Sequence, residues 1–166
     1  MTNIADMLLD GNLKASWVPV IANIAAPTVA ELNAGVSLEE RLTPDGLNIG
    51  FDTSMIDNSA LNSTYDTEQV GRSKVTTTLK YKAGAVGTSD AVRDALTFRA
   101  VGYLVVRRGT DSATAFAAAQ EVEVYPSQCG RPNPDVPAPN AIQVVTVQLG
   151  STGTPRGFDD PGVVAA

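Results

Sequence analysis

The chain has 166 residues, with 18 acidic and 12 basic side chains, a formal net charge of −6 and no histidine. This length suits one ordinary domain whose core needs no disulfide or metal. The acidic balance disfavours binding to the phosphate backbone of nucleic acids, and the missing histidine removes the commonest general base and zinc ligand.

The sequence also bears on redox chemistry and location. Cys129 is the only cysteine, so no disulfide can form within one chain. No run of 18 apolar residues is present, and the first ten residues carry acids where a signal peptide needs bases. We therefore expect a protein that is made and folded in a cytoplasm and is not associated with a membrane.

Residues 1–14 predict an N-terminal arm. Ile4, Met7 and Leu8 lie at helical spacing, and Gly11 would end a short helix there. The alternative is a frayed terminus, since chain ends are often poorly ordered.

A strand and a helix are predicted next. Segment 16–22 has strand character, and Trp17, the only tryptophan, serves as a core or interface anchor. Segment 27–35 is a short helix, because Thr28 and Glu31 have the spacing of a capping box.

A turn separates the next two predicted strands. Segment 36–42 alternates apolar and polar residues as a strand does, and alternation resumes over 47–52. The T-P-D-G sequence at 43–46 has turn chemistry, in which Gly46 would supply a positive φ.

The stretch from residue 52 to 71 is polar and rich in turn-forming residues. Loops this long are uncommon in compact domains and are usually functional or mobile. Met55, Ile56, Leu61 and Tyr65 are scattered through it, although a purely solvated loop would not need them. We expect an extended loop or hairpin that becomes ordered against something outside its own core.

The segment 70–82 has the clearest strand pattern of the chain. Val, Leu, Tyr and Thr side chains alternate with polar ones, which predicts one buried and one solvated face. The solvated face carries Lys74, Lys80 and Lys82, which is unusual in so acidic a chain. These lysines either blunt an exposed sheet edge or form a docking surface for an acidic neighbour, such as another copy of the chain.

The second half of the chain predicts one helix and three strands. The helix spans 88–98, with Asp90 near its positive end. The strand at 99–108 is apolar on both faces and is therefore central. Further strands follow at 121–125 and 141–149.

Three other segments of this half are expected to lie outside the core strands and the helix. Segment 110–119 is either a short helix or a loop. Segment 126–140 contains five prolines and predicts an extended connection with little hydrogen bonding to a sheet. Segment 151–166 has the composition of a flexible C-terminal tail.

These elements predict a mainly β (α+β) fold. Helices do not regularly separate the strands, which disfavours a parallel sheet. We expect an antiparallel β-sandwich or partly open barrel with one or two short flanking helices. A single domain would span 15–150, with its long loop at 52–71, between the arm at 1–14 and the tail at 151–166.

The sequence offers no pattern for a catalytic, cofactor or metal site, so we predict that the protein is not an enzyme. A catalytic dyad needs carboxyl groups that converge in a pocket, and three acidic pairs have the character of surface charge instead. Cys129 lies in a Pro/Gly-rich stretch without a basic partner, so a catalytic thiol is not expected. The acidic pairs are Glu39–Glu40, Glu121/Glu123 and Asp159–Asp160.

Three stretches follow one another in a characteristic order: P-T-V-A-E-L-N-A-G at 27–35, T-P-D-G-L-N-I at 43–49 and I-D-N-S-A-L at 56–61. This order resembles the major tail tube proteins of long-tailed, siphovirus-type bacteriophages, especially those that infect actinobacteria. The resemblance is best from residue 17 to 81, and its motifs are structural rather than catalytic.

The resemblance implies a virion protein of the tail, assembled in the host cytoplasm. Hexameric rings would stack around a tape-measure protein into a β-lined tube that a tail terminator closes. Double-stranded DNA would pass through the lumen without specific binding, which suits the negative net charge.

The resemblance also suggests which residues make the contacts between copies. The long loop would reach the neighbouring ring, and the lysine face of 70–82, a candidate docking surface from its strand pattern alone, would suit a contact with another subunit. The candidate loop contacts are Met55, Ile56, Asp57, Asn58, Leu61, Tyr65, Asp66 and Glu68, and the candidate docking face is Lys74, Lys80 and Lys82.

Two alternatives stay open. One is another phage ring protein, such as a tail terminator or a capsid decoration protein, which would form single rings or clusters. The other is a monomeric β-sandwich module that binds a small ligand or sugar. An enzyme ranks below both.

Overall fold

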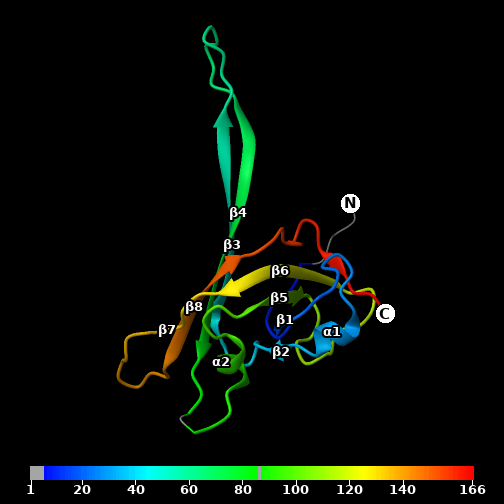
Figure 1. Ribbon diagram of the computed structural model, residues 1–166, viewed down its shortest axis with the longest axis vertical. Coiled ribbons are helices and arrows are strands. Elements are labelled where there is room, and N and C mark those ends of the chain that lie inside the picture. The colour runs from blue at the N-terminus through cyan, green and yellow to red at the C-terminus, as the bar shows by residue number, and fades with distance from the viewer. Residues whose placement is uncertain (1–5, 86) are drawn as a thin grey trace.

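The computed structural model describes residues 6–85 and 87–166 (Figure 1). Within these residues, nine strands form one antiparallel sheet in the order β2-β1-β5-β6-β8-β4-β3, with β7 beside β8 and β9 beside β6. The helices are α1 (Val29–Asn33) and α2 (Ala91–Ala95). The strands are β1 (Leu13–Val18), β2 (Val36–Ser37), β3 (Leu42–Asp57), β4 (Glu68–Lys82), β5 (Val101–Arg108), β6 (Glu121–Cys129), β7 (Asn133–Pro134), β8 (Val144–Ser151) and β9 (Gly162–Val163).

The predicted mainly β, antiparallel fold with short helices is confirmed. Its strands lie in one open sheet instead of the two stacked sheets of a sandwich. The sheet ends at the short β2 on one side and at the long β3 on the other. Within the described residues, no helix is long and apolar enough to cross a membrane.

Hydrophobic cores lie on both faces of the sheet. Successive strand residues point to opposite faces, so Leu104 and Val106 of β5 pack in one core and Val105 in the other. Val92 of α2 belongs to the first core, and Leu32 of α1 belongs to the second. The prediction of a central strand covered on both sides is therefore confirmed.

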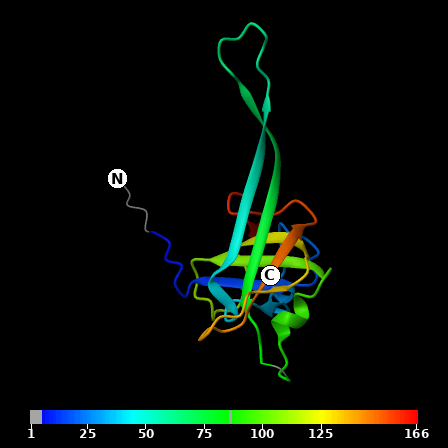
Figure 2. The same cartoon turned by 90° about the vertical axis from the view of Figure 1, so that its left-hand side faces the viewer.

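β4 has the alternation predicted for 70–82. Thr77, Leu79 and Tyr81 are buried, whereas Lys74 and Thr76 are exposed. The buried side chains belong to the part of β4 that pairs with β8 as well as with β3. Beyond this part, β3 and β4 continue as a long hairpin that projects from the body (Figures 1 and 2).

The T-P-D-G sequence interrupts the ladder of this hairpin near its base. Leu42 pairs with Tyr81 and Leu47 pairs with Leu79, so residues 43–46 bulge out of β3. The predicted positive φ of Gly46 is wrong, because this glycine is not among the residues with positive φ. A glycine is needed there for space, since a Cβ on Gly46 would lie 2.3 Å from the carbonyl oxygen of Lys80.

The capping box predicted for the first helix is confirmed. The Glu31 amide donates to the Thr28 hydroxyl (3.3 Å), and the Thr28 amide donates to the Glu31 carboxylate (2.8 Å). α2 begins at Asp90, whose carboxylate accepts from the Arg93 amide (3.2 Å). Asp90 is thus the N-cap itself.

Two segments near the chain ends differ from the predictions. None of residues 6–12 lies in a helix, and Ile4 is outside the described residues. Residues 151–166, expected as a flexible tail, contact the sheet: β9 pairs with β6, and Val164 is 2 % exposed in the second core. Because these contacts join residues far apart in sequence, composition did not reveal them.

The predictions for the proline-rich segment 126–140 and for segment 110–119 have different outcomes. The expectation of a connection outside the sheet is wrong for 126–134, because β6 runs through Pro126 and β7 pairs with β8. Pro126 has no amide hydrogen to donate, but its carbonyl still accepts a hydrogen bond from the Thr152 amide (3.0 Å). Segment 110–119 is a loop, and the buried Arg107 donates to three of its carbonyl groups.

Candidate assembly surfaces

The outer half of the β3–β4 hairpin has no core of its own. Every residue from 51 to 70 except Ser59 is exposed. β3 has 16 residues, and an extended strand of that length spans about 50 Å. The choice between a loop and a hairpin for 52–71 is thereby resolved, since only residues 58–67 remain as the connecting turn.

The turn at the hairpin tip is held by its own hydrogen bonds. Asp57 accepts from the Ser59 amide (2.8 Å), and the Asn58 amide donates to the Thr67 carbonyl (3.0 Å). The Thr67 amide in turn donates to the Ser59 hydroxyl (2.9 Å). Hydrogen bonds from Ser59 hold the pKa of Asp57 below its usual value.

Six large hydrophobic side chains are exposed on the hairpin. Leu61 is 107 % and Tyr65 is 81 % exposed, and each of the others is at least half exposed. Six such side chains on one projecting element make the hairpin a candidate interaction site. The remaining four are Phe51, Met55, Ile56 and Val70.

The hairpin also offers free strand edges. β3 is the last strand of the sheet. β8 pairs with β4 only over Thr77–Lys82, so β3 is the one partner strand of residues 68–76 within the described part of the chain. Unpaired edges of this kind readily add a strand from another chain.

The three lysines of the predicted docking face lie in different surroundings. Lys74 is exposed on the free part of β4. The Lys80 ammonium lies 3.6 Å from the carboxylate of Asp45, and Lys82 lines a pocket. Because β4 lies between β3 and β8 at Lys80 and Lys82, the idea that these two lysines blunt a sheet edge is wrong.

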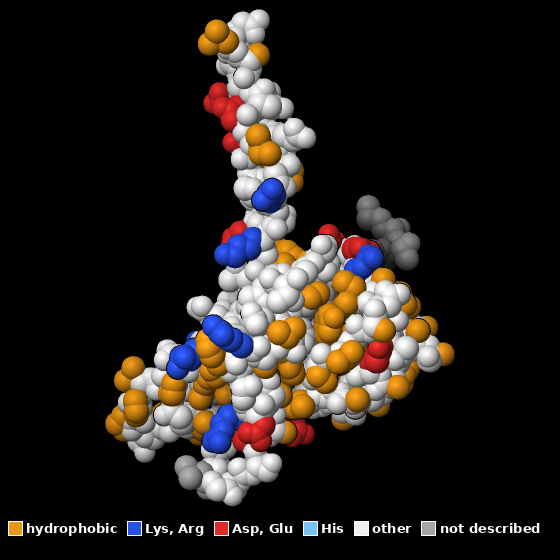
Figure 3. Space-filling view, viewed as in Figure 1, with side chains coloured by type: hydrophobic (Ala, Val, Ile, Leu, Met, Phe, Trp, Pro, Cys, Tyr) orange, Lys and Arg blue, Asp and Glu red, His pale blue; other side chains and the backbone are white. Residues whose placement is uncertain are grey.

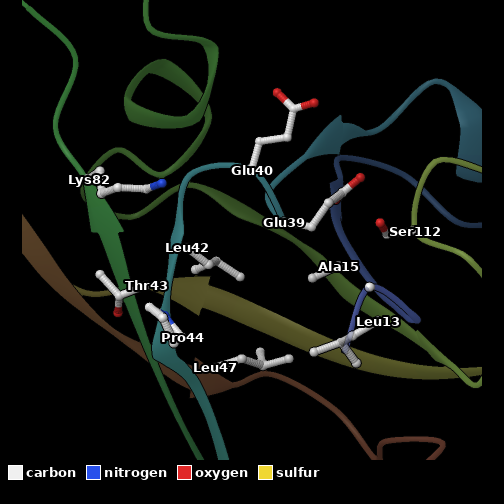
Figure 4. A pocket seen from close by; sticks show the side chains of 11 residues that line it. Leu13, Ala15, Glu39, Glu40, Leu42, Thr43, Pro44, Leu47, Lys82 and Ser112 are labelled. Atoms are coloured by element: carbon white, nitrogen blue, oxygen red, sulfur yellow. The ribbon is translucent and has the colours of Figure 1, made fainter. Parts of the chain in front are cut away.

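The pocket beside Lys82 has a volume of about 420 Å³ (Figure 4). Glu39 and Glu40 also line it, but Glu39 lies 3.3 Å from the ammonium of Lys14, and Figure 4 shows the Glu40 carboxylate pointing away from the apolar floor. Carboxylates that diverge in this way cannot work together as acid and base. The floor consists of Leu13, Ala15, Leu42 and Leu47.

A comparison with known protein families shows to which family the chain belongs. A family model described as phage tail tube protein matches residues 1–160. The chain belongs to the phage tail tube protein family. No curated protein matches it.

This tail tube protein is a structural subunit of the tail tube and part of the virion tail, and it is not an enzyme. The family implies self-assembly, so the projecting hairpin and its free edges are candidate contacts between copies. Membership of the tail tube family decides against the alternatives that the sequence left open, namely a tail terminator, a capsid decoration protein and a monomeric binding module.

The prediction that Glu121 and Glu123 are both solvated surface charges is wrong for Glu123. Glu123 is 5 % exposed, and its Oε1 lies 2.5 Å from the Arg108 Nε. The Tyr125 hydroxyl donates to the other carboxylate oxygen (2.7 Å). The hydrogen bond to Glu123 raises the pKa of Arg108, and burial raises the pKa of Tyr125. This ion pair ties β5 to β6.

Cys129 also lies elsewhere than expected. It ends β6 and is 2 % exposed in the first core, instead of lying in a loop. Burial raises the pKa of its thiol to about 11, so the thiol stays protonated at neutral pH.

The sequence prediction missed Phe51 and Val70 as hairpin contacts. Both fit an alternating strand pattern, and Phe51 lies in the strand predicted over 47–52, where apolar residues alternate with polar ones. Val70 is exposed because it lies on the part of β4 that pairs with β3 alone, whereas Phe51 is 50 % exposed although its ring lies 6.3 Å from that of Tyr125 in β6. The polar composition of the adjoining 52–71 stretch was the available signal that the core ends there.

Proposed function

We propose that this tail tube protein forms stacked hexameric rings in the tail of a siphovirus-type phage of an actinobacterial host. The order of motifs in the first half of the chain supports the phage type and the host. The free edges of β3 and β4 support a tube in which sheets of neighbouring subunits join. A tape-measure protein inside the tube and a tail terminator at its end would be the further partners.

The tube would conduct double-stranded DNA. A net charge of −6 supports this role, because a wall with few accessible cations releases few counterions from DNA and holds it weakly. The subunit would thus act passively, as a channel wall.

The projecting hairpin carries the proposal. Its exposed apolar side chains, Leu61 and Tyr65 above all, would contact the adjacent ring. Lys74 would belong to a subunit contact, whereas Lys80 and Lys82 would belong to it only if a neighbour covers their face of β4. The other contacts proposed from the hairpin are Met55, Ile56, Asp57, Asn58, Asp66 and Glu68.

Shortening the hairpin tests this role. Residues 58–67 would be replaced by Asn-Gly, a pair that favours a two-residue hairpin turn between Asp57 and Glu68. We expect a folded subunit that forms rings but no tubes, seen by electron microscopy and light scattering. The control is Val136→Ser, which removes an apolar side chain that is 90 % exposed outside the hairpin and should leave elongation unchanged. Tubes of normal length from the shortened variant would contradict the proposal.

A further inference from the structure

Phe98 and two arginines form an exposed cluster on the body of the subunit. The guanidinium carbons of Arg99 and Arg131 lie 5.2 and 4.8 Å from the centre of the Phe98 ring. Phe98 is still 47 % exposed. Both guanidinium groups therefore lie at cation–π distance from a ring that a further group can contact.

A groove of about 640 Å³ is lined by Phe98 and Arg99 of this cluster and by Lys74, and Arg131 lies beside Phe98 outside this lining. Residues of β4, β6 and β8 form its walls, where β8 ends and β4 continues into the hairpin. Lys74 and Arg99 line it, and none of its lining residues is acidic. Among the described residues, no carboxylate forms a salt bridge with Lys74, Arg99 or Arg131. Figure 3 shows Lys and Arg side chains beside hydrophobic ones on the body below the hairpin.

Such a groove favours an anionic partner. Arg99 and Arg131 lie against one ring without a salt-bridging carboxylate and repel one another, whereas Lys74 has Asp52 opposite it on β3. A partner that brings carboxylates and an aromatic ring would relieve the repulsion and cover Phe98. Complementary charge of this kind gives an interface its specificity and its register.

The outer hairpin has this complementary chemistry. Residues 53–71 include Asp57, Asp66 and Glu68 and no Lys or Arg, and the exposed Tyr65 directly precedes Asp66. Among the described residues, these three carboxylates form no salt bridge. In Figure 3 the end of the hairpin shows acidic and hydrophobic side chains, and a basic side chain lies farther down toward the body.

A hairpin cannot deliver its tip to the groove of its own subunit. Lys74 lies on β4 at the groove, and the eight residues back to Asp66 span roughly 26 Å in extended conformation. The hairpin runs straight away from the body (Figures 1 and 2). Any hairpin tip in the groove must therefore come from a second copy.

We propose that the groove lined by Lys74, Phe98 and Arg99, with Arg131 beside Phe98, receives the acidic hairpin tip of a second copy of this chain. An arginine fork holds a carboxylate such as that of Asp66 through two parallel hydrogen bonds. The Tyr65 ring adds an aromatic contact with Phe98. The proposal rests on the proposed function, in which rings stack through the hairpin, and it adds the surface that receives the tip.

Charge reversal tests this pairing. Arg131→Glu and Asp66→Arg each place like charges at the contact, so we expect each to raise the protein concentration needed for tube growth by about tenfold or more. The two substitutions combined restore opposite charges and should return it to within about threefold of the wild type. Arg93→Glu is the matched control, since Arg93 is exposed on α2 and belongs neither to the groove nor to the pair of arginines on Phe98. Circular dichroism of each variant checks that the subunit is folded.

The outcomes separate this proposal from the proposed function. Tubes from the wild type, loss of tubes on shortening the hairpin, and rescue by the double variant support the groove. Tubes from Arg131→Glu at the concentration of Arg93→Glu, or no rescue by the double variant, would overturn the groove alone. A shortened hairpin that still elongates would overturn the inter-ring role of the hairpin and the groove proposal that rests on it. Binding of a DNA duplex that Arg131→Glu abolishes while tubes grow normally would assign the groove to phosphate and also overturn this proposal.

Cross-linking gives a second readout that keeps the charges intact. Thr67→Cys at the tip and Gln128→Cys in the groove are both at exposed positions, and the native Cys129 is buried. Under mild oxidation the chain with both substitutions should give a ladder of disulfide-linked multimers on a non-reducing gel. Each single substitution should give dimers at most. The absence of a ladder from assembled tubes would contradict the placement of the tip.

Discussion

Asp57 on β3 lies directly opposite Glu68 on β4, as the last pair of the hairpin ladder. Both side chains are exposed, and like charges that face one another across a strand pair destabilise it. In a lone subunit the end of the hairpin therefore carries a local electrostatic repulsion, which cations of a neighbouring subunit would relieve.

Glu68→Thr should stabilise the tip of the hairpin in the isolated subunit. Removing one of the two facing carboxylates lowers the repulsion, so we expect amide hydrogen exchange at the tip to slow by roughly two- to fivefold. Asp52→Asn is the contrasting control, because Asp52 faces Lys74 across the same ladder and its loss removes an attraction. Faster exchange in Glu68→Thr than in the wild type would show that the facing carboxylates do not weaken the hairpin.

Gly46→Ala should destabilise the subunit markedly. A Cβ there would lie 2.3 Å from the backbone oxygen of Lys80, which cannot move without disturbing β4. We expect a loss of about 2–4 kcal/mol in the free energy of unfolding, measured by denaturant titration. The control is Gly50→Ala on the same strand, where the nearest atom is 3.9 Å away and the change should be under about 1 kcal/mol. Equal effects of the two substitutions would refute the spatial requirement at Gly46.

The Asp90 carboxylate should make stability depend on pH in the acid range. Burial alone would raise its pKa, but hydrogen bonds from the Arg93 and Gly84 amides and the charge of Arg41 (3.1 Å) outweigh burial and hold it below the usual 3.8. Because the folded-state pKa is depressed, this stabilisation is complete well above pH 3.8 and is lost as the pH falls through the folded-state value.

Asp90→Asn tests this pH dependence. Asn keeps an N-cap oxygen but loses the charge, so we expect a loss of about 1–2 kcal/mol in the free energy of unfolding at pH 7. The difference from the wild type should shrink as the pH falls below 3.8. A difference that stays constant from pH 7 to pH 3 would show that the ionised carboxylate makes no contribution.

Cys129 should be unreactive in the folded subunit. Its thiol is buried, and burial raises its pKa to about 11, so little thiolate exists at pH 8. We expect labelling by a soluble disulfide reagent only at the rate at which the subunit unfolds, and complete labelling in denaturant. Rapid labelling of the folded subunit would contradict the place of Cys129 in the core.

Local patterns in the sequence were enough to predict the elements that local physics controls. The alternation through Leu79 and Tyr81 indicated which face of β4 is buried, and the spacing of Thr28 and Glu31 indicated where α1 begins. The apolar composition of 99–108 indicated a central strand. Each of these features depends on residues within a few positions of one another.

Contacts between residues far apart in the sequence could not be predicted from such local patterns. Arg131 reaches Phe98 only because β6 pairs with β5, and Glu123 meets Arg108 through the same pairing. The proximity of these side chains depends on sheet order and register, which periodicity does not encode. For the same reason the hairpin tip was recognised as a candidate contact, whereas the groove that we propose for it was not.

Electron microscopy of the purified subunit across a concentration series, together with light scattering, tests the central claim most directly. If the projecting hairpin joins copies of this tail tube protein, hollow tubes of stacked rings should appear as the concentration rises and should lengthen with it. A subunit that remains monomeric at every concentration, with its hairpin intact and folded, would contradict the account.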